Sequence, residues 1–498
     1  VFITIIIIIY AIFSEAKAAA EAKATAAEAK VKATEAKADK KSRKIINAMD
    51  FYQGRFALAF KDGKYGFIDQ DGDIVIDYEY TKGEPFNAET GYAEMEKSDT
   101  IVNTKYLIDT SGTRYQLINI FEVLNADYRV ESTLFKKLLT TLEEGEEKLA
   151  LNFSGLAKLN VSKILKEISK EDGLKSRINM LYLNKTNLYQ FPLILLNFKN
   201  LKELDLSNTK IFSLPSTFSD LTELVKLDLR NTELRSIPKE IGRLQFLEKL
   251  YLPEALDEFP DSIFKIKSLN ILDLSSTKFD IIPEGLGNLI NLKKIYLPKS
   301  LDRLPDNLFN LASLEILDLR ITEFDIIPKE IGNLRNLKEL YLPDSLEQFP
   351  SSIFTITSLE VLDLRGTKLN IIPKEIGDLI HLKELYLPNS LEQFPSSIFK
   401  IDRLEILDLR GTNFDTIPEG IGALIHLKEL YLPTSLEKIP QSLSQLENLK
   451  FLSISLYQNK NSAFLKARLE KLREELPSCN IRVTDEKGEL IKLTKGKN

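Results

Sequence analysis

Few residues of this 498-residue chain are of the types that carry out chemistry. Its one cysteine, Cys479, excludes an intrachain disulfide framework and a cysteine-rich zinc site. Its two histidines, His381 and His426, occupy matching Ile-His-Leu segments, so sequence duplication explains them better than acid–base catalysis or metal binding. We therefore predict a protein that is not an enzyme, with no catalytic residue, no cofactor and no metal site.

A different set of polar and aromatic side chains recurs at regular intervals between residues 205 and 431. Aspartate and tyrosine alternate at one position of successive short strands, and arginine stands two residues after several of the aspartates. Alternate residues of a strand share a face, and tyrosine and arginine dominate interface energetics. We predict that this face binds a protein or peptide partner through Asp228, Arg230, Tyr251, Asp273, Tyr296, Asp318, Arg320, Tyr341, Asp363, Arg365, Tyr386, Asp408, Arg410 and Tyr431.

The same residue types also allow a purely structural interpretation. Aspartate can pair with arginine and with tyrosine hydroxyls, which would give a solvated ladder whose polar groups satisfy one another. Surface ion pairs contribute about 0–1 kcal/mol each, so such a ladder would stabilise the fold only modestly. The sequence leaves both interpretations open.

The composition of the chain limits its number of domains and its class of partner. The chain has 67 Lys and Arg against 73 Asp and Glu, a formal charge of −6, and 43% of its residues are hydrophobic. This length predicts roughly three domains, and this hydrophobic fraction is enough for packed cores. An acidic balance argues against nucleic acid as a partner, since nucleic-acid binders usually present a basic surface.

A repeat positions the candidate residues. Prolines recur at intervals of 22 or 23 residues, at positions 192, 215, 238, 260, 283, 305, 328, 350, 373, 395, 418 and 440. Each follows the pattern L-x-x-L-x-L, a small residue and an apolar residue, as in the segment from Leu359 to Pro373. Two unit types alternate, one with Leu-Asp-Leu and one with Leu-Tyr-Leu-Pro. Each unit offers a short strand and a helical or 3₁₀ turn, and can bury its leucines only by stacking on its neighbours.

These units are identified as leucine-rich repeats, and they resemble the intracellular type found in plant nucleotide-binding immune receptors and Ras-associated leucine-rich proteins. The resemblance implies an α/β solenoid over residues 149–460, with a parallel sheet on the concave face, closed by a C-terminal cap over 461–498. It also implies protein binding. The family's usual asparagine is replaced by Thr or Ser, whose hydroxyl we expect to bond the neighbouring turn's backbone. Ala255 has no hydroxyl, which predicts one weaker rung.

The chain opens with an apolar run over residues 1–13. Thirteen helical residues span about 20 Å, short of the roughly 30 Å hydrocarbon core. We expect the C-terminal part of a transmembrane helix that begins upstream, which would make the protein membrane-anchored; a signal-peptide remnant and a buried core helix are the alternatives. The lysines and arginines that follow favour a cytoplasmic soluble part.

Residues 14–46 are rich in alanine, glutamate and lysine, and Glu-Ala-Lys recurs every seven residues at 21–23, 28–30 and 35–37. These are strong helix formers, so we predict a helical stalk. Alanines with heptad spacing offer a surface for self-association as a weak coiled coil, and a solvated single helix is the alternative.

Short alternating segments separated by Asp-Gly turns predict a small β-rich domain over residues 47–117. Tyr65-Gly66 followed by an Ile-Asp strand resembles the Trp-Gly core of the WG-type β repeat of bacterial proteins, and a looser copy follows near Tyr106. That family implies an interaction or spacer module. Residues 118–148 read as a helical linker and N-terminal cap of the repeats.

Together these features predict a membrane-tethered scaffold or sensor arm that captures a protein on the concave face of its repeats. Two alternatives remain at this stage. One is a secreted or surface adhesin, and the other is a structural spacer of a larger signalling NTPase receptor.

Overall fold

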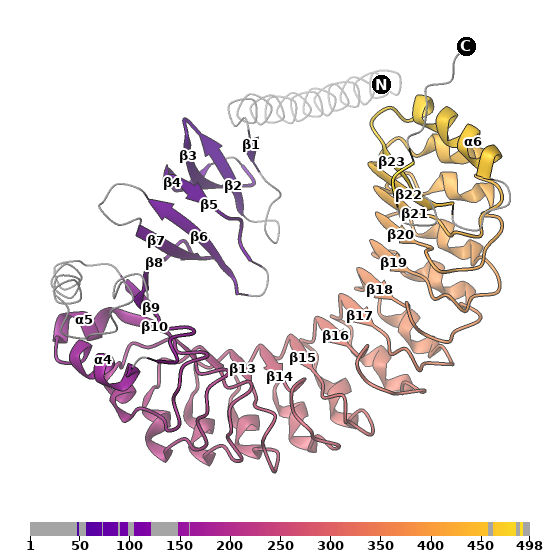
Figure 1. The fold of residues 1–498 in the computed structure, drawn as a ribbon. Helices are drawn as coiled ribbons and strands as arrows, with labels where there is room; N and C mark the ends of the chain where they lie inside the picture. The colour runs from indigo at the N-terminus through magenta and orange to yellow at the C-terminus, as the bar shows by residue number, and fades with distance from the viewer. Residues whose placement is uncertain are drawn as a thin grey trace, which may run out of the picture. The chain divides into compact units, whose positions relative to one another are not determined.

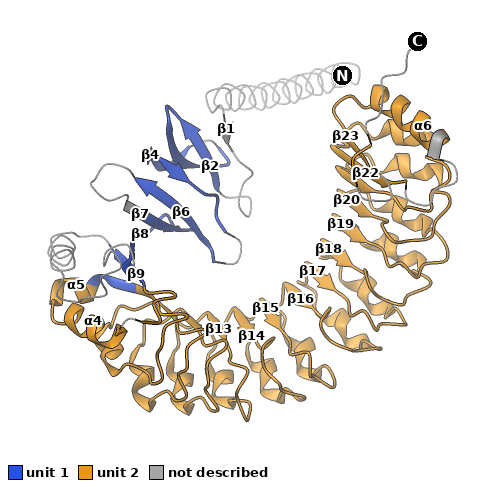
Figure 2. Ribbon diagram, in the orientation of Figure 1, with its two compact units in different colours: residues 1–152, 177–179 blue, residues 153–176, 180–498 orange. Residues whose placement is uncertain are grey.

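The computed structural model describes residues 47–48, 56–71, 73–87, 90–97, 104–120, 148–158, 160–456, 462–484 and 489–491. The chain divides into two compact units, residues 1–152 with 177–179 and residues 153–176 with 180–498 (Figure 2). The predicted membrane helix and stalk and nearly all of the predicted linker lie outside the described residues. Within the described part, no helix combines the length and apolarity needed to cross a membrane.

The first unit begins with a four-stranded antiparallel sheet of β1 (Asn47–Ala48), β2 (Phe56–Lys61), β3 (Lys64–Asp69) and β4 (Ile74–Tyr80). The Asp62-Gly63 turn between β2 and β3 has φ values of 52° and 79°, as a tight hairpin turn requires. A Cβ at Gly66 would stand 2.5 Å from the carbonyl oxygen of Ile76, so this position needs glycine.

The rest of the first unit repeats the antiparallel pattern. Strands β5 (Lys82–Gly83), β6 (Tyr92–Lys97), β7 (Thr104–Asp109) and β8 (Arg114–Asn119) pair in order, and β9 (Lys148–Asn152) adds in parallel to β8. Phe67 and Tyr80 from the first copy pack with Met95 and Ile108 from the second in one core. Among the described residues, strands are present over the range 47–117 as the sequence predicts, and both copies contribute to one core.

The second unit opens with α4 (Val161–Ile168) and α5 (Asp172–Arg177), followed by β10 (Ile178–Tyr182). Eleven three-residue strands follow: β11 (Glu203–Asp205), β12 (Lys226–Asp228), β13 (Lys249–Tyr251), β14 (Ile271–Asp273), β15 (Lys294–Tyr296), β16 (Ile316–Asp318), β17 (Glu339–Tyr341), β18 (Val361–Asp363), β19 (Glu384–Tyr386), β20 (Ile406–Asp408) and β21 (Glu429–Tyr431). Each pairs in parallel with the next, and β22 (Phe451–Ser455) continues the series.

A five-residue 3₁₀ helix begins directly after each of the twelve prolines. These helices are η1 (Leu193–Asn197), η2 (Ser216–Asp220), η3 (Lys239–Arg243), η4 (Asp261–Lys265), η5 (Glu284–Asn288), η6 (Asp306–Asn310), η7 (Lys329–Asn333), η8 (Ser351–Thr355), η9 (Lys374–Asp378), η10 (Ser396–Lys400), η11 (Glu419–Ala423) and η12 (Gln441–Gln445). Proline fixes φ and needs no donor at this position, so it starts the turn at no cost in hydrogen bonds. Within the second unit the strands line the inner side of the curve and the 3₁₀ helices the outer side (Figure 1).

The core of the second unit is a continuous stack of leucines between these two layers. The central residue of each strand, such as Leu317, Leu340 and Leu362, has no exposed surface. A fully buried leucine contributes about 1.5–3 kcal/mol relative to an exposed one. The stacked core predicted from the proline spacing is confirmed.

The hydroxyl prediction is confirmed for one unit type and wrong for the other. Serine hydroxyls bond carbonyls of the preceding repeat, as in Ser390 to Leu369 at 2.6 Å and Ser345 to Phe324 at 2.6 Å. The threonines instead bond their own turn, three residues back, as in Thr367 to Leu364 at 2.8 Å. Both hydroxyls stand three residues after a leucine, so the local backbone path and not the spacing decides which carbonyl each one reaches. At Ala255, which is exposed, the rung keeps the backbone hydrogen bond from Asp257 to Arg235 at 3.0 Å.

The C-terminal end of the solenoid is formed by α6 (Ser462–Glu475) and β23 (Asn480–Thr484), which pairs in parallel with β22. This agrees with the C-terminal cap expected over residues 461–498. An isolated antiparallel bridge between Thr484 and Leu490 follows.

Thr367→Val tests the role of the threonine turns. Valine keeps the volume of this buried side chain but cannot donate to the Leu364 carbonyl. We expect the free energy of unfolding to fall by about 1 kcal/mol in denaturant titrations. Thr367→Ser, which keeps the hydroxyl, is the control, and equal losses in the two variants would contradict a role for this hydrogen bond.

Candidate functional site

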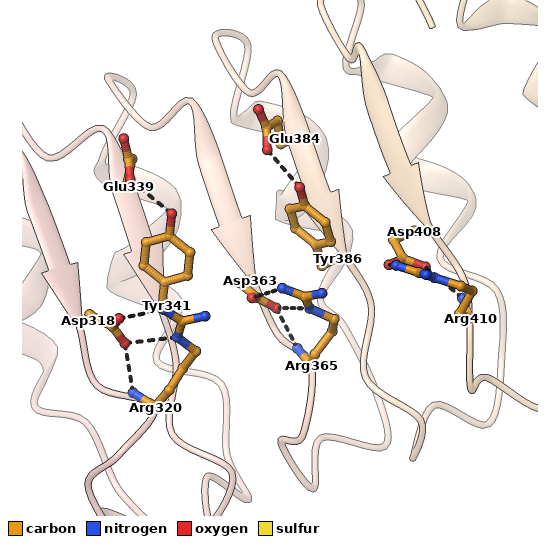
Figure 3. Close-up of polar contacts among 10 residues, drawn as sticks. All are labelled: Asp318, Arg320, Glu339, Tyr341, Asp363, Arg365, Glu384, Tyr386, Asp408 and Arg410. Carbon is orange, nitrogen blue, oxygen red and sulfur yellow. Dashed lines mark hydrogen bonds and ion pairs between the residues drawn. The ribbon is translucent and has the colours of Figure 1, made fainter. Parts of the chain in front are cut away.

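Strand pairing places the predicted site residues side by side. Asp318 pairs with Tyr341, Tyr341 with Asp363, and Asp363 with Tyr386 (Figure 3). The alternation continues through Asp408 to Tyr431. The structure thereby brings the aspartates and tyrosines into one row across the sheet, which comprises Asp228, Tyr251, Asp273, Tyr296, Asp318, Tyr341, Asp363, Tyr386, Asp408 and Tyr431. The in-register row expected from the spacing is confirmed.

Each predicted arginine forms a fork with the aspartate two residues before it. Arg365 donates from Nε to Oδ1 of Asp363 at 2.9 Å and from Nη2 to Oδ2 at 2.6 Å. The backbone N–H of Arg365 donates to the same Oδ1 at 3.0 Å. The same arrangement recurs in the pairs Asp228–Arg230, Asp318–Arg320 and Asp408–Arg410.

The two partners of each fork differ in exposure. The Asp363 and Asp408 side chains are each 2% exposed, whereas those of Arg365 and Arg410 are 45% and 55% exposed. Asp363 and Asp408 therefore hold their arginines from below and are themselves out of reach of a ligand, whereas the Asp318 side chain is 22% exposed. The hydrogen bond that Arg365 donates to Asp363 raises the pKa of the Arg365 guanidinium, which therefore stays charged.

Each guanidinium lies over the ring of the next tyrosine. The distance from the arginine Cζ to the ring centroid is 4.5 Å for Arg230 over Tyr251 and 4.3 Å for Arg365 over Tyr386. Arg320 over Tyr341 and Arg410 over Tyr431 give 4.4 and 4.3 Å. Such cation–π stacking fixes the plane of the guanidinium at a part-exposed position.

The tyrosine hydroxyls bond glutamates that sequence reasoning had left out of the site. Tyr341 donates to Glu339 at 2.9 Å, and Tyr386 donates to Glu384 at 2.7 Å. Tyr431 donates to Glu429 at 2.7 Å. Each glutamate stands two residues before its tyrosine on the same strand, so the same-face rule could have identified it. The expected bond between aspartate and tyrosine hydroxyl is replaced by this glutamate contact.

Burial and the neighbouring glutamate act in the same direction on these phenols. Burial is the larger cause that raises the pKa of Tyr341 and Tyr386, and the hydrogen bond to the adjacent carboxylate raises it further. Both hydroxyls therefore stay protonated and remain donors well beyond neutral pH.

The pattern is weaker in the middle of the series. Ser275 occupies the arginine position after Asp273 and donates to it from both its hydroxyl and its backbone N–H, at 2.6 and 2.9 Å. The ring of Tyr296 is covered by Lys294 at 4.7 Å in place of an arginine. The uninterrupted arginine series therefore consists of Arg320, Arg365 and Arg410.

A second ladder, not predicted as part of any site, runs along the positions that precede the strands. Glu315 contacts both Lys293 and Lys338, at 2.9 and 2.8 Å. The pairs Lys383–Glu360 and Lys428–Glu405 follow at 2.8 and 2.7 Å. Glutamate precedes the strands of one unit type and lysine precedes those of the other. These ion pairs therefore favour an order in which the two unit types alternate.

The remaining candidate residues are not assembled into a catalytic arrangement. His381 accepts a 3.3 Å contact from Arg403, and His426 is exposed. Cys479 is buried, which raises the pKa of its thiol to about 11 and keeps it protonated at neutral pH. In the described part of the chain no three histidine, cysteine, aspartate or glutamate side chains cluster as metal ligands would.

Models of leucine-rich repeat families match most of the second unit. The model described as "Leucine-rich repeat region" matches residues 226–300 and 361–492. The one described as "BspA type Leucine rich repeat region (6 copies)" matches residues 280–376, and "Leucine Rich Repeat" matches residues 200–221. No curated protein matches the chain.

Solved structures give the same architecture. A leucine-rich repeat protein of Leptospira interrogans is 27% identical, with a TM-score of 0.55, over 70% of this chain and 97% of that one. TLR13, solved in a complex with ssRNA13, is 20% identical, with a TM-score of 0.52, over 70% of this chain and 59% of TLR13. At 20% identity, the likeness to TLR13 concerns the fold alone.

The raised tyrosine pKa values predict a loss of stability in alkali. In the unfolded chain these phenols ionise near pH 10, and in the folded chain only above it. Their contribution is complete below pH 10 and is lost as pH rises towards the folded pKa, because the unfolded state then releases protons more readily. The free energy of unfolding should fall as pH rises above 10, and fall less steeply in a Tyr341→Phe, Tyr386→Phe double variant. Identical slopes in the two proteins would contradict this assignment.

Proposed function

We propose that this chain, which is a leucine-rich repeat protein, binds a protein or peptide partner on the concave sheet of its second unit and has no enzymatic activity. One observation carries the proposal. At every second strand from β16 to β20, a part-exposed arginine is stacked on a tyrosine and bonded to an aspartate beneath it, of which Asp363 and Asp408 are buried.

This arrangement prepares residues that dominate binding energy. An arginine whose fork and stacking plane are already fixed loses little rotamer freedom when a partner binds. In Arg320, Arg365 and Arg410, Nε and Nη2 are used by aspartate. A partner carboxylate or carbonyl can approach the outer edge of the guanidinium without displacing either bond. The contacts of the purely structural interpretation, in which aspartate pairs with arginine, are thus compatible with binding. They orient the arginines and leave their outer edges available to a partner.

The chemistry of the face favours a polypeptide over RNA. Glu339, Glu384 and Glu429 lie in one register on the same face as the arginines, and the whole chain has a formal charge of −6. A surface that alternates fixed cations with carboxylates repels a uniformly anionic backbone. The RNA in the TLR13 complex is therefore not carried over to this chain.

The N-terminal parts complete the proposal as a tether. The apolar run of residues 1–13 would anchor the protein in a membrane, the Ala/Glu/Lys-rich stalk would hold the repeats away from it, and the basic residues favour a cytoplasmic soluble part. The β-rich domain would serve as a degenerate WG-type spacer. A surface adhesin and a spacer of a larger receptor are the competing functions.

Site-specific photocrosslinking tests the docking surface. A photoreactive amino acid at Tyr386 in the full chain should give discrete adducts with one protein in native cells. Adducts should disappear when Arg365→Gln and Arg410→Gln are added. The matched control is Ile371, an exposed residue outside the sheet. Equal adducts from Ile371, or adducts from Tyr386 that survive both arginine changes, would contradict the proposal.

A cysteine introduced at Ala27 tests the tether. With Cys479 buried, a membrane-impermeant thiol reagent reports on the new site alone. We expect the protein to sediment with membranes and to resist labelling in intact cells until they are permeabilised. Labelling in intact cells would instead support the adhesin.

A further inference from the structure

Three parallel rows cross the sheet between β16 and β21. The arginine row is Arg320, Arg365 and Arg410, the tyrosine row is Tyr341, Tyr386 and Tyr431, and the glutamate row is Glu339, Glu384 and Glu429. The tyrosines lie between the other two, since each ring is covered by an arginine and each hydroxyl bonds a glutamate (Figure 3). The face therefore carries fixed positive charge along one side, part-buried aromatic rings in the middle and negative charge along the other.

The spacing along each row matches the period of a helical heptad. Members of a row are two strands apart, which is about 10 Å at the usual separation of neighbouring strands. Seven residues of an α-helix rise about 10.5 Å. An extended strand repeats its side chains on one face every 6.6–6.8 Å or so, and falls out of step with the rows. A helix that lies along the solenoid axis and repeats its charges every seven residues would meet each rung in turn.

One segment of the sequence has this period and the complementary order of charges. Glu-Ala-Lys stands at 21–23, 28–30 and 35–37. At 100° per residue, the helix predicted there would carry a row of glutamates, a row of alanines 100° further round and a row of lysines 100° beyond that. Glutamate, alanine and lysine would face arginine, tyrosine and glutamate. Alanine is small enough to let the helix approach the tyrosine rings, and the two longer side chains can reach sideways to the flanking rows.

The numbers of repeats also agree. Three Glu-Ala-Lys heptads face three complete Arg–Tyr–Glu rungs, and the arginine series is interrupted at Ser275, one rung before Arg320. We propose that the rows of this sheet bind the stalk, residues 14–46, of a second copy of the chain. This inference rests on the proposed docking function and names the occupant of that surface. Tethering copies to one membrane would raise their effective concentration, so individually weak ion pairs suffice.

Disulfide trapping between two differently labelled full-length chains tests the contact. One chain carries Glu28→Cys and the other Arg365→Cys, both with Cys479→Ser, so that a single rung is replaced and two remain. We expect a mixed disulfide dimer on mixing under mild oxidation. The matched control is Ala27→Cys, which would lie about 160° round the predicted helix from the alanine row, away from the sheet, and should cross-link far less. Equal cross-linking from Ala27, or a disulfide that forms only within one chain carrying both cysteines, would overturn the proposal.

A charge exchange separates loss of contact from loss of folding. Glu21, Glu28 and Glu35 changed together to Arg should weaken association about tenfold or more in sedimentation experiments. So should Arg320, Arg365 and Arg410 changed together to Glu. A mixture of the two variants should recover association, because the native stalk of the second variant meets the native rows of the first, and the reversed stalk meets the reversed rows. Failure of the mixture to recover, with both variants folded, would refute stalk binding. If Tyr386 still cross-links to a different protein, the docking function stands and only this occupant is wrong.

Discussion

A strand of three residues cannot keep its central leucine out of water by itself. Leu362 is fully buried because the strands of Leu340 and Leu385 pair with its own in the same register and the 3₁₀ helices close the other side. This parallel, in-register pairing is the constraint on which every other feature of the second unit depends. It places equivalent residues of successive 45-residue periods two strands apart on the same face. Identical side chains therefore form rows across the sheet.

The alternation of two unit types brings different side chains of neighbouring units into contact. Aspartate in one unit holds its own arginine, and that arginine reaches the tyrosine of the next unit, so the arginine–tyrosine contact crosses a repeat boundary. The lysine–glutamate ladder at the strand entrances alternates in the same way. Both ladders are satisfied only when unlike units are adjacent, and this favours the observed order over any that places like units together. The same contacts leave arginines part exposed in a fixed orientation, which joins the stability of the array to its proposed binding surface.

The repeat fold and the order of residues across the sheet could be predicted from the sequence, because the same spacing recurs in every unit. Proline spacing located the 3₁₀ helices, and strand alternation placed Asp363 beside Tyr386 and Tyr341. Side-chain hydrogen bonds could not be predicted in the same way, because they depend on local backbone path and rotamer. Thr367 bonds its own turn where Ser390 reaches the preceding one, although both replace the same asparagine. The same-face rule places Glu384 on the surface, but the hydrogen bond it accepts from Tyr386 and the burial of Asp363 beneath the surface are visible only in the structure.

The most direct measurement is hydroxyl-radical footprinting of the full chain, purified alone at high dilution and again within its native assembly. The account predicts that oxidation of Tyr341, Tyr386 and Tyr431 falls in the assembly, while that of the exposed Ile281, Ile326 and Ile371 outside the sheet is unchanged. Unchanged oxidation of the tyrosines, or protection confined to the isoleucines, would contradict binding at the concave face.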